Sequence, residues 1–289
     1  MSSVNPYLTV VILTFNEEKR IQRVIDNYVN HFKILILDNF SSDNTIKICK
    51  SNNIHYKQIQ NNGHLDSKVI SEIICNIDTE WVFFVQCSEF SPPEFIIEIK
   101  KLIQKKDLRA ILFNRVSYTG GIITHNLKRL YKQKKNHHVF SRLFNKNYIE
   151  IRFSKIHYEF PIIINKKNQF EIISEEINKS LLHFRNIDID SGEIKHMNYS
   201  KFDANQMFVD GKRGSYLRVI FRPIKSILFF INLDFIKDFN YYKFITLVQH
   251  FQYILSVELK LLEKTKEKDL IFCNEKNKEV IEKFTNIEQ

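Results

Sequence analysis

The chain has 289 residues, of which 44% are hydrophobic and 26% charged, and its formal net charge is +10. This length suits one large α/β domain with an appendage, or two small domains. Only six glycines and five prolines are present, which excludes collagen-like and low-complexity classes. The positive charge favours anionic partners such as nucleotide diphosphates, anionic lipid headgroups or nucleic acid.

The cysteines and the chain start bear on the cellular compartment. No metal-type spacing relates the four cysteines, so we expect a reducing environment. No basic region followed by an apolar core opens the sequence, and no apolar segment of 18 residues occurs, so we expect neither a secretory signal nor a membrane-spanning helix. We therefore expect a cytoplasmic protein, located at the inner face of the membrane. The cysteines are Cys49, Cys75, Cys87 and Cys273.

The first predicted strand covers residues 8–14 and stops abruptly at polar positions. Residues 10–13 are all apolar, which is typical of a strand covered on both faces in a parallel sheet. A helix is predicted near 17–30. Glu17 and Glu18 are expected in its first turn, where acidic side chains favour the exposed backbone N–H groups.

Two further apolar runs also end in polar side chains. They predict strands near 33–38 and 81–86, followed by helices near 43–52 and 92–105. Ser42 or Asp43 is expected to cap the first of these helices, and Pro92 and Pro93 open the second. Since the carboxyl ends of parallel strands form the ligand crevice of open α/β sheets, we expect one polar rim there. Each rim residue also has an ordinary interpretation as a cap or turn. The rim comprises Asn16, Glu17, Asp38, Asp43, Gln86, Ser88 and Glu89.

The rest of the pattern predicts two domains. Strands near 54–59 and 110–116 and a helix near 65–77 complete a mostly parallel sheet with right-handed crossovers. Short β segments follow, and from about residue 191 the chain is predicted to be helical, with a charged, solvated segment at 258–268. We assign residues 1–188 to an α/β domain and 189–289 to a helical C-terminal region. The short β segments are predicted near 121–124, 138–144, 151–157, 161–164 and 181–184.

Three segments at the predicted rim resemble a family 2 glycosyltransferase: 14–18, 37–45 and 80–89. The resemblance is strong over about residues 8–95 and weaker over 140–205. It implies the GT-A fold, an α/β class with a mostly parallel sheet flanked by helices, here with a helical C-terminal appendage. It also implies inverting transfer of a sugar from a nucleoside diphosphate sugar, UDP-linked. The chain is similar in particular to the bacterial subgroup that builds lipooligosaccharide cores and other surface glycans.

The resemblance implies a set of donor-binding residues. Asp38, at the end of the second strand, would accept a hydrogen bond from the imino N–H of uracil. Asp43 either joins this site or only caps a helix. Lys68 either lies near the diphosphate or is a solvated helix lysine. The residues passing beside the base and ribose would be Thr14, Phe15, Asn16 and Glu17.

The sequence departs from the family at the diphosphate. The family pattern there is Asp-x-Asp followed by Glu, and its second Asp binds a divalent metal. This chain has Gln86, Cys87 and Ser88, with Glu89 retained. Neither Gln nor Ser carries the charge that Mg²⁺ or Mn²⁺ prefers. Three alternatives stay open: a metal-free enzyme that uses Lys or Arg as counter-charge, a metal held by Glu89 and His157, or a protein that binds but no longer catalyses.

The candidate base lies in a segment that resembles the family's Val-His-Glu triplet. Tyr158 takes the place of the family's Glu, and Glu159 follows one position later. In a strand, that shift moves the carboxylate to the opposite face, unless a bulge restores its direction. We predict Glu159 as the base and His157 as the alternative, since its pKa suits proton transfer near neutrality. Both could instead be strand residues without a catalytic role. His183 falls in a segment that would flank the acceptor.

The acceptor and the surface partners follow from the resemblance and the charge pattern. A surface-glycan or lipid-linked acceptor is expected. The chain has no Gln-x-x-Arg-Trp sequence, which favours adding one sugar per encounter. Basic and aromatic residues alternate over 212–236, which suits peripheral contact with a membrane. No nucleic-acid motif supports nucleic-acid binding. The competing function is a catalytically inactive nucleotide-sugar-binding or scaffold protein of the same fold.

Overall fold

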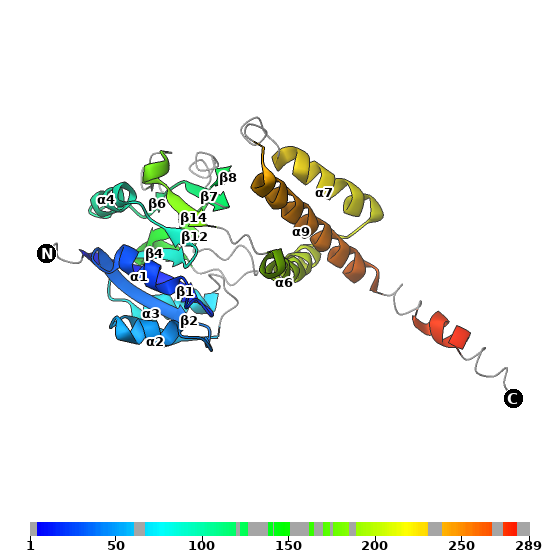
Figure 1. Ribbon diagram of the computed structural model, residues 1–289, viewed down its shortest axis with the longest axis horizontal. Helices are drawn as coiled ribbons and strands as arrows, with labels where there is room; N and C mark the ends of the chain where they lie inside the picture. The colour runs from blue at the N-terminus through cyan, green and yellow to red at the C-terminus, as the bar shows by residue number, and fades with distance from the viewer. Residues whose placement is uncertain are drawn as a thin grey trace. The chain divides into compact units, whose positions relative to one another are not determined.

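A computed structural model places the chain in two compact units, Met1–Arg185 and Asn186–Gln289. Figure 1 shows the first unit as strands and helices and the second as helices. The structure describes residues 5–60, 67–119, 122–126, 138–140, 142–150, 162–164, 170–173, 176–184, 189–230, 239–267 and 274–281.

The first unit is built on a seven-stranded sheet with the order β13-β6-β10-β4-β1-β2-β3. Strand β1 pairs in parallel with β2 and β4, whereas β10 is antiparallel to β4 and β6. The mostly parallel sheet flanked by helices confirms the predicted fold class. The strands are β1 (Asn5–Thr14), β2 (Phe32–Asp38), β3 (His55–Gln58), β4 (Trp81–Gln86), β6 (Ala110–Leu112), β10 (Leu143–Asn145) and β13 (Phe170–Ile172).

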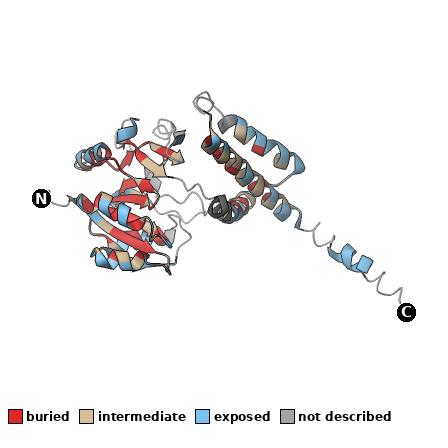
Figure 2. Cartoon of the chain, in the orientation of Figure 1, coloured by how far each residue is buried: buried red, intermediate tan, exposed pale blue. Residues whose placement is uncertain are grey.

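Both faces of this sheet are covered by apolar side chains, as the strand pattern predicts. In β1, Val10 and Ile12 belong to the cluster that contains α1 and α4 residues, while Val11 belongs to the cluster with α3 residues. Successive side chains of a strand point to opposite faces, so every position of this run must be apolar. Buried residues accordingly follow the strands in Figure 2. The helices are α1 (Ile21–Tyr28), α2 (Thr45–Ser51), α3 (Ser67–Asn76) and α4 (Pro93–Leu102).

Two smaller sheets complete the unit. In the four-stranded sheet the order is β5-β14-β7-β8, and in the three-stranded sheet it is β11-β12-β9. Since β5 begins three residues after β4 ends, residues 87–88 carry the chain from the large sheet into the four-stranded one. The bounds are β5 (Glu89–Phe90), β7 (Arg115–Thr119), β8 (Ile122–Asn126), β9 (His138–Phe140), β11 (Ile149–Glu150), β12 (Ile162–Ile164), β14 (Leu181–Phe184) and the 3₁₀ turns Lys146–Tyr148 and Ile177–Lys179.

The predicted single strand at 110–116 was wrong. Strands β6 and β7 belong to different sheets, and Phe113 and Asn114 separate them. The Phe113 ring packs 5.6 Å from Phe83, centroid to centroid. Asn114 accepts a backbone hydrogen bond from Leu181 at 3.0 Å. These long-range contacts turn the chain where the local pattern favours continuing.

The start of the first helix also differs from the prediction. Helix α1 begins at Ile21, with no acidic residue in its first turn. The backbone N–H groups of Glu17 and Glu18 instead donate to Thr45 at the start of α2 and to Asp43 in the β2–α2 loop. By contrast, α4 begins at Pro93 with Glu94 in its first turn, as the sequence predicts.

The second unit contains α6 (Ile189–Val209), α7 (Tyr216–Phe230) and α9 (Tyr241–Thr265), with both α6 and α7 packed against α9. The prediction that residues 258–268 are solvated was wrong for Glu258, which is completely buried. Glu258 faces α7, and its carboxylate accepts hydrogen bonds from Arg218 Nε and Nη2 at 3.0 and 3.1 Å and another from Arg222. Among the described residues, no helix combines the length and hydropathy needed to cross a membrane.

Candidate active site

The strand register brings three predicted site residues, Thr14, Asp38 and Gln86, to one edge of the large sheet. Thr14 on β1 lies opposite Asp38 on β2, and Leu13 lies opposite Gln86 on β4. All three strands run in the same direction, so their carboxyl ends open onto a common edge. The two loops that leave β1 and β2 are joined there by side-chain hydrogen bonds.

Asp38 organises this edge from a completely buried position. Its Oδ1 accepts hydrogen bonds from Thr14 Oγ1 at 3.0 Å and from Ser41 Oγ at 2.5 Å. Its Oδ2 accepts from the Ser41 backbone N–H at 2.9 Å and from Gln58 Nε2 at 3.1 Å. Both carboxylate oxygens therefore already accept hydrogen bonds from protein donors. A nucleobase could bind them only after one of these donors moved.

Asn16 links the two loops. It has a φ of 54°, in the left-handed region that Asn tolerates better than most residues. Its backbone N–H donates to Ser41 Oγ at 2.8 Å, and its Oδ1 accepts from the Ser42 backbone N–H at 2.9 Å. The β1–α1 and β2–α2 loops are thus fixed to each other at their tips.

A second set of hydrogen bonds fixes the loop bases. Asp43 accepts from the Glu18 backbone N–H at 3.0 Å and from the Thr45 backbone N–H at 2.9 Å. Burial by itself would raise the pKa of Asp43, but the hydrogen bonds from Thr45 and Glu18 outweigh it and lower that pKa. The Glu17 carboxylate accepts from Arg20 at 2.6 Å.

The two loops expose aromatic rings beside this polar framework. Phe15, after β1, and Phe40, after β2, are each 58% exposed. An exposed aromatic ring offers a flat apolar surface against which a nucleobase can stack. The predicted rim therefore separates into two kinds of residue: polar side chains that hold the loops together, and two rings that the loops present to solvent.

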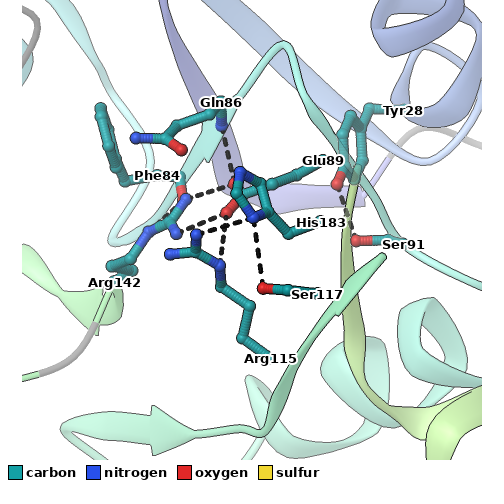
Figure 3. Close-up of polar contacts among 9 residues, drawn as sticks. All are labelled: Tyr28, Phe84, Gln86, Glu89, Ser91, Arg115, Ser117, Arg142 and His183. Atoms are coloured by element: carbon teal, nitrogen blue, oxygen red, sulfur yellow. Dashed lines mark hydrogen bonds and ion pairs between the residues drawn. The ribbon is translucent and has the colours of Figure 1, made fainter. Parts of the chain in front are cut away.

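Glu89 lies where the third strand of the rim ends, and two arginines hold it (Figure 3). Its carboxylate is completely buried and accepts hydrogen bonds from Arg142 at 2.7 and 2.5 Å. The Gln86 backbone N–H donates to it at 2.8 Å, and Arg115 Nε lies 3.5 Å away. Arg142 also donates to the Phe84 carbonyl at 2.9 Å, which fixes the guanidinium against β4.

His183 and Ser117 extend this cluster through Arg115. The His183 Nδ1 accepts a hydrogen bond from Arg115 Nη2 at 2.9 Å, and Ser117 Oγ lies 3.3 Å from the same nitrogen. An arginine can only donate, so Nδ1 carries no proton in this contact. Figure 3 shows the imidazole beside the Glu89–arginine group, on a strand of the four-stranded sheet.

The Glu89 carboxylate lies among positive charges. Burial by itself would raise the pKa of Glu89, but the charge and hydrogen bonds of Arg142, with the charge of Arg115, outweigh it and lower that pKa. Glu89 is therefore ionised near neutral pH, and two guanidinium groups face one carboxylate. Both guanidinium groups lie at the end of β4, where the family's metal-binding motif would lie.

The residues at this position do not suit a divalent metal. Gln86 and Ser88 carry no charge, and both oxygens of Glu89 are held by protein donors. Burial raises the pKa of the Cys87 thiol well above its usual range, so that side chain is not the thiolate a metal requires. Within the described part of the chain, no group of three or more His, Cys, Asp or Glu side chains could hold a metal ion.

The remaining predicted site residues are not tested by this geometry. Lys68 is the second residue of α3, and its side chain lies outside the described residues. Glu159 and His157, the predicted base and its alternative, also lie outside them. The Ser88 carbonyl accepts from the Phe184 backbone N–H at 2.8 Å. The sequence alone assigned no site role to Arg115, Arg142 or Gln58, because their partners Glu89 and Asp38 are distant in the chain. It also assigned none to Ser41 or Thr45, which bind nearby carboxylates as well as the distant loop after β1.

Comparisons with known proteins identify the family to which this chain belongs. A family model described as "Glycosyl transferase family 2" matches residues 9–165. An uncharacterized glycosyltransferase of Rickettsia bellii is 22% identical over 241 residues, covering 82% of this chain and 79% of that protein. The SPbeta prophage-derived glycosyltransferase SunS of Bacillus subtilis is 22% identical over 138 residues, which span 45% of this chain but only 32% of SunS.

Solved structures give weaker matches. The crystal structure of S. aureus TarS residues 1–349 in complex with UDP-GlcNAc is 12% identical, with a TM-score of 0.46 and 90% of each chain covered. Glucosyl-3-phosphoglycerate synthase from Mycobacterium tuberculosis, in complex with Mn²⁺, UDP and glucosyl-3-phosphoglycerate, is 17% identical with a TM-score of 0.31. That match covers 40% of this chain and 45% of the synthase.

Proposed function

Because the chain belongs to glycosyl transferase family 2, we propose that it moves a sugar from UDP, with inversion, onto a surface-glycan or lipid-linked acceptor. Membership of the family gives the general activity: the chain is a GT-A glycosyltransferase that uses a nucleotide-sugar donor. UDP as the nucleotide, the inversion, the acceptor and any membrane contact are the proposal. The observation that carries it is the common edge formed by β1, β2 and β4, with two aromatic rings presented by interlocked loops.

In this proposal the base of the nucleotide lies against Phe15 and Phe40. Thr14, Asn16 and Asp38 act as positioning residues, because their hydrogen bonds fix the loops that carry the rings. Glu17 and Asp43 hold the other end of the same loops. Loops preorganised in this way lower the entropic cost of donor binding, because they need not be ordered when the donor binds.

The departing diphosphate is stabilised without a metal in this proposal. The Glu89 cluster places the guanidinium groups of Arg115 and Arg142 at the end of β4, and Arg115 is the more exposed of the two. A guanidinium can donate two parallel hydrogen bonds to phosphate oxygens, which compensates the charge developing on the leaving group. Gln86 and Ser88 would lie near the phosphates as uncharged hydrogen-bonding residues, and Lys68 would lie near them as a cation.

Proton removal from the acceptor is assigned to Glu159, with His157 as the alternative. An inverting transfer needs one base on the acceptor side and no covalent intermediate on the protein. Replacing the base should abolish transfer while leaving donor binding intact. Glu159→Gln should therefore lose activity with an unchanged UDP-induced thermal shift, and His157→Asn should do so instead if the histidine is the base.

Thermal unfolding with nucleotides tests the donor site. A panel of UDP, GDP and CDP, each in EDTA and in Mn²⁺, separates nucleotide choice from metal need. At a concentration of about 100 Kd, UDP should stabilise the folded state by about 2.7 kcal/mol, which raises the melting temperature by about 5 to 10 °C. We expect the same shift in EDTA as in Mn²⁺. A shift that appears only with Mn²⁺ would contradict the metal-free mechanism, and no shift with any nucleotide would contradict the donor site.

Two variants test where the nucleobase of the donor binds. Phe15→Ala and Phe40→Ala remove exposed rings, so they should leave stability unchanged while weakening UDP binding about tenfold each, the usual effect of losing a base–aromatic stack. Tyr7→Ala is the matched control, since Tyr7 is 54% exposed near the other end of β1. If Tyr7→Ala weakens UDP binding equally, the rings do not define the site. Transfer to glycan acceptors, measured with and without EDTA, then tests catalysis; UDP binding without transfer would leave only the binding function.

A further inference from the structure

Helix α7 exposes a continuous apolar face. Its outward residues are each between 47% and 70% exposed, and Figure 2 shows most of this helix as exposed. At about 100° of rotation per residue, they cover one arc of about 140° around the helix axis. The stripe, as we call it, consists of Tyr216, Leu217, Ile220, Phe221, Ile224 and Leu228.

The opposite face of α7 is fixed against α9. Arg218 and Arg222 donate to the buried Glu258, and Ser226 Oγ lies 2.5 Å from His250 Nε2. Pro223 of the same helix is buried. These contacts set the rotation of α7 about its axis, so the stripe cannot turn inward without breaking them. An amphipathic helix of a globular protein normally buries its apolar stripe, and α7 does the reverse.

The charges beside the stripe are all positive. Residues 216–230 contain no Asp or Glu, and Lys212 and Arg213 precede the helix. By helical geometry Arg218, Arg222 and Lys225 lie between one edge of the apolar arc and the face held against α9, and the buried Glu258 compensates one of their three charges. Two copies meeting through this face would bring these cations together, which costs free energy, whereas an anionic surface would attract them.

We propose that the stripe of α7 is an interfacial anchor for an anionic lipid bilayer. The helix would lie in the plane of the membrane, with the six stripe side chains among the upper acyl chains and the basic edge among the headgroups. This inference goes beyond the sugar transfer proposed above, and it stands on the second unit alone. It narrows the predicted membrane contact at 212–236 to one helix face; residues 231–236 and the side chains of Phe229 and Phe230 lie outside the description.

Sedimentation of the full chain with lipid vesicles tests the proposal. Binding should be strong to vesicles of mixed phosphatidylglycerol and phosphatidylcholine, and at least about tenfold weaker to pure phosphatidylcholine, because each basic residue near an anionic surface contributes measurably. The double variant Leu217→Ser/Phe221→Ser should weaken binding to mixed vesicles by at least about tenfold. Its matched control is Ile97→Ser on α4, where Ile97 is 62% exposed; this variant should bind like the natural chain.

Two charge-reversal double variants test the contribution of the basic residues beside the stripe. Lys212→Glu/Lys225→Glu should weaken binding to mixed vesicles and remove most of its dependence on phosphatidylglycerol. Lys101→Glu/Lys106→Glu changes two exposed lysines of the first unit by the same charge and should have little effect. Equal losses in both pairs would show that only net charge matters, and would overturn the assignment to α7.

Fluorescence gives a readout that does not depend on the disruptive variants. Trp81 is the only tryptophan and is buried in β4, so Phe221→Trp adds one exposed reporter on the stripe. Its emission should shift to the blue on mixed vesicles, relative to the natural chain. No shift, no vesicle binding, or a dimer in light scattering that Leu217→Ser/Phe221→Ser separates would each overturn the proposal, the last by assigning the stripe to a second copy.

Discussion

In the part of the chain that the structure describes, each unit has a glutamate with a completely buried side chain held by two arginines. In the first unit Glu89 pairs with Arg142 and Arg115, and in the second Glu258 pairs with Arg218 and Arg222. The carboxylates are alike, but the arginines are not. The side chain of Arg142 is 13% exposed, whereas that of Arg222 is 47% exposed.

This difference separates an enclosed ion pair from one that borders a surface. Arg142 is held by Glu89 and by the Phe84 carbonyl at the junction of two sheets. Arg222 lies on α7, where water reaches its guanidinium. Removing one partner of an enclosed pair leaves a charge without compensation, while removing one partner of a bordering pair leaves charges that water can solvate. The same residue types should therefore contribute differently to stability in the two units.

The largest expected effect is that of removing Arg142. Arg142→Leu leaves the Glu89 carboxylate buried with Arg115 at 3.5 Å as its remaining basic partner. We expect a loss of about 3–5 kcal/mol in the free energy of unfolding of the first unit. Urea unfolding followed by Trp81 fluorescence measures it, because that single tryptophan reports on the first unit.

The double variant Arg142→Leu/Glu89→Leu is the control for this loss. It removes both charges, so it should be clearly more stable than Arg142→Leu alone. If the two variants are equally unstable, packing of the Arg142 stem, rather than an uncompensated charge, explains the effect.

A smaller effect is expected for the matched change in the second unit. Glu258→Gln leaves Arg218 and Arg222 partly exposed to water, so the loss should be at the low end of about 1.5–3 kcal/mol, the usual range for hydrogen bonds to charged groups. Glu89→Gln should lower the free energy of unfolding by more than this, because the Arg142 guanidinium stays enclosed without its carboxylate. Trp81 fluorescence follows urea unfolding of the first unit, and any far-UV ellipticity change that does not coincide with it follows the helical second unit. Equal losses in the two variants would remove the distinction between enclosed and bordering pairs.

The smallest effect is a pH dependence that sharpens the comparison. Arg142 and Arg115 outweigh burial and hold the pKa of Glu89 below its ordinary value of 4.5. The unfolded chain therefore takes up this proton first as the pH falls, so the stabilisation is complete above about pH 4.5 and is lost as the pH falls through the folded-state pKa. The stability difference between the natural chain and Glu89→Gln should shrink below about pH 4.5. A difference that stays constant down to about pH 3 would contradict the ion-pair explanation.

The amino-acid sequence by itself determined the features that depend on neighbouring residues. The unbroken apolar run in β1 specified a strand buried on both faces, because side chains alternate between the two faces. Pro93 and Glu94 specified the start of α4. The polar residues after β1, β2 and β4 specified one edge of the sheet, since parallel strands end together. The proposals for the bound nucleotide and for the catalytic base depend on the resemblance to family 2 glycosyltransferases.

Only the tertiary structure decided which charges meet. Glu89 and Arg142 are 53 positions apart, and no local pattern connects them. Asp38 proved to be enclosed by protein donors, and Glu258, in a segment predicted to be solvated, proved to be buried against α7. The outward direction of the α7 stripe has the same origin. A helical period shows that a helix has an apolar face, but long-range contacts determine whether that face is turned toward the core or toward solvent.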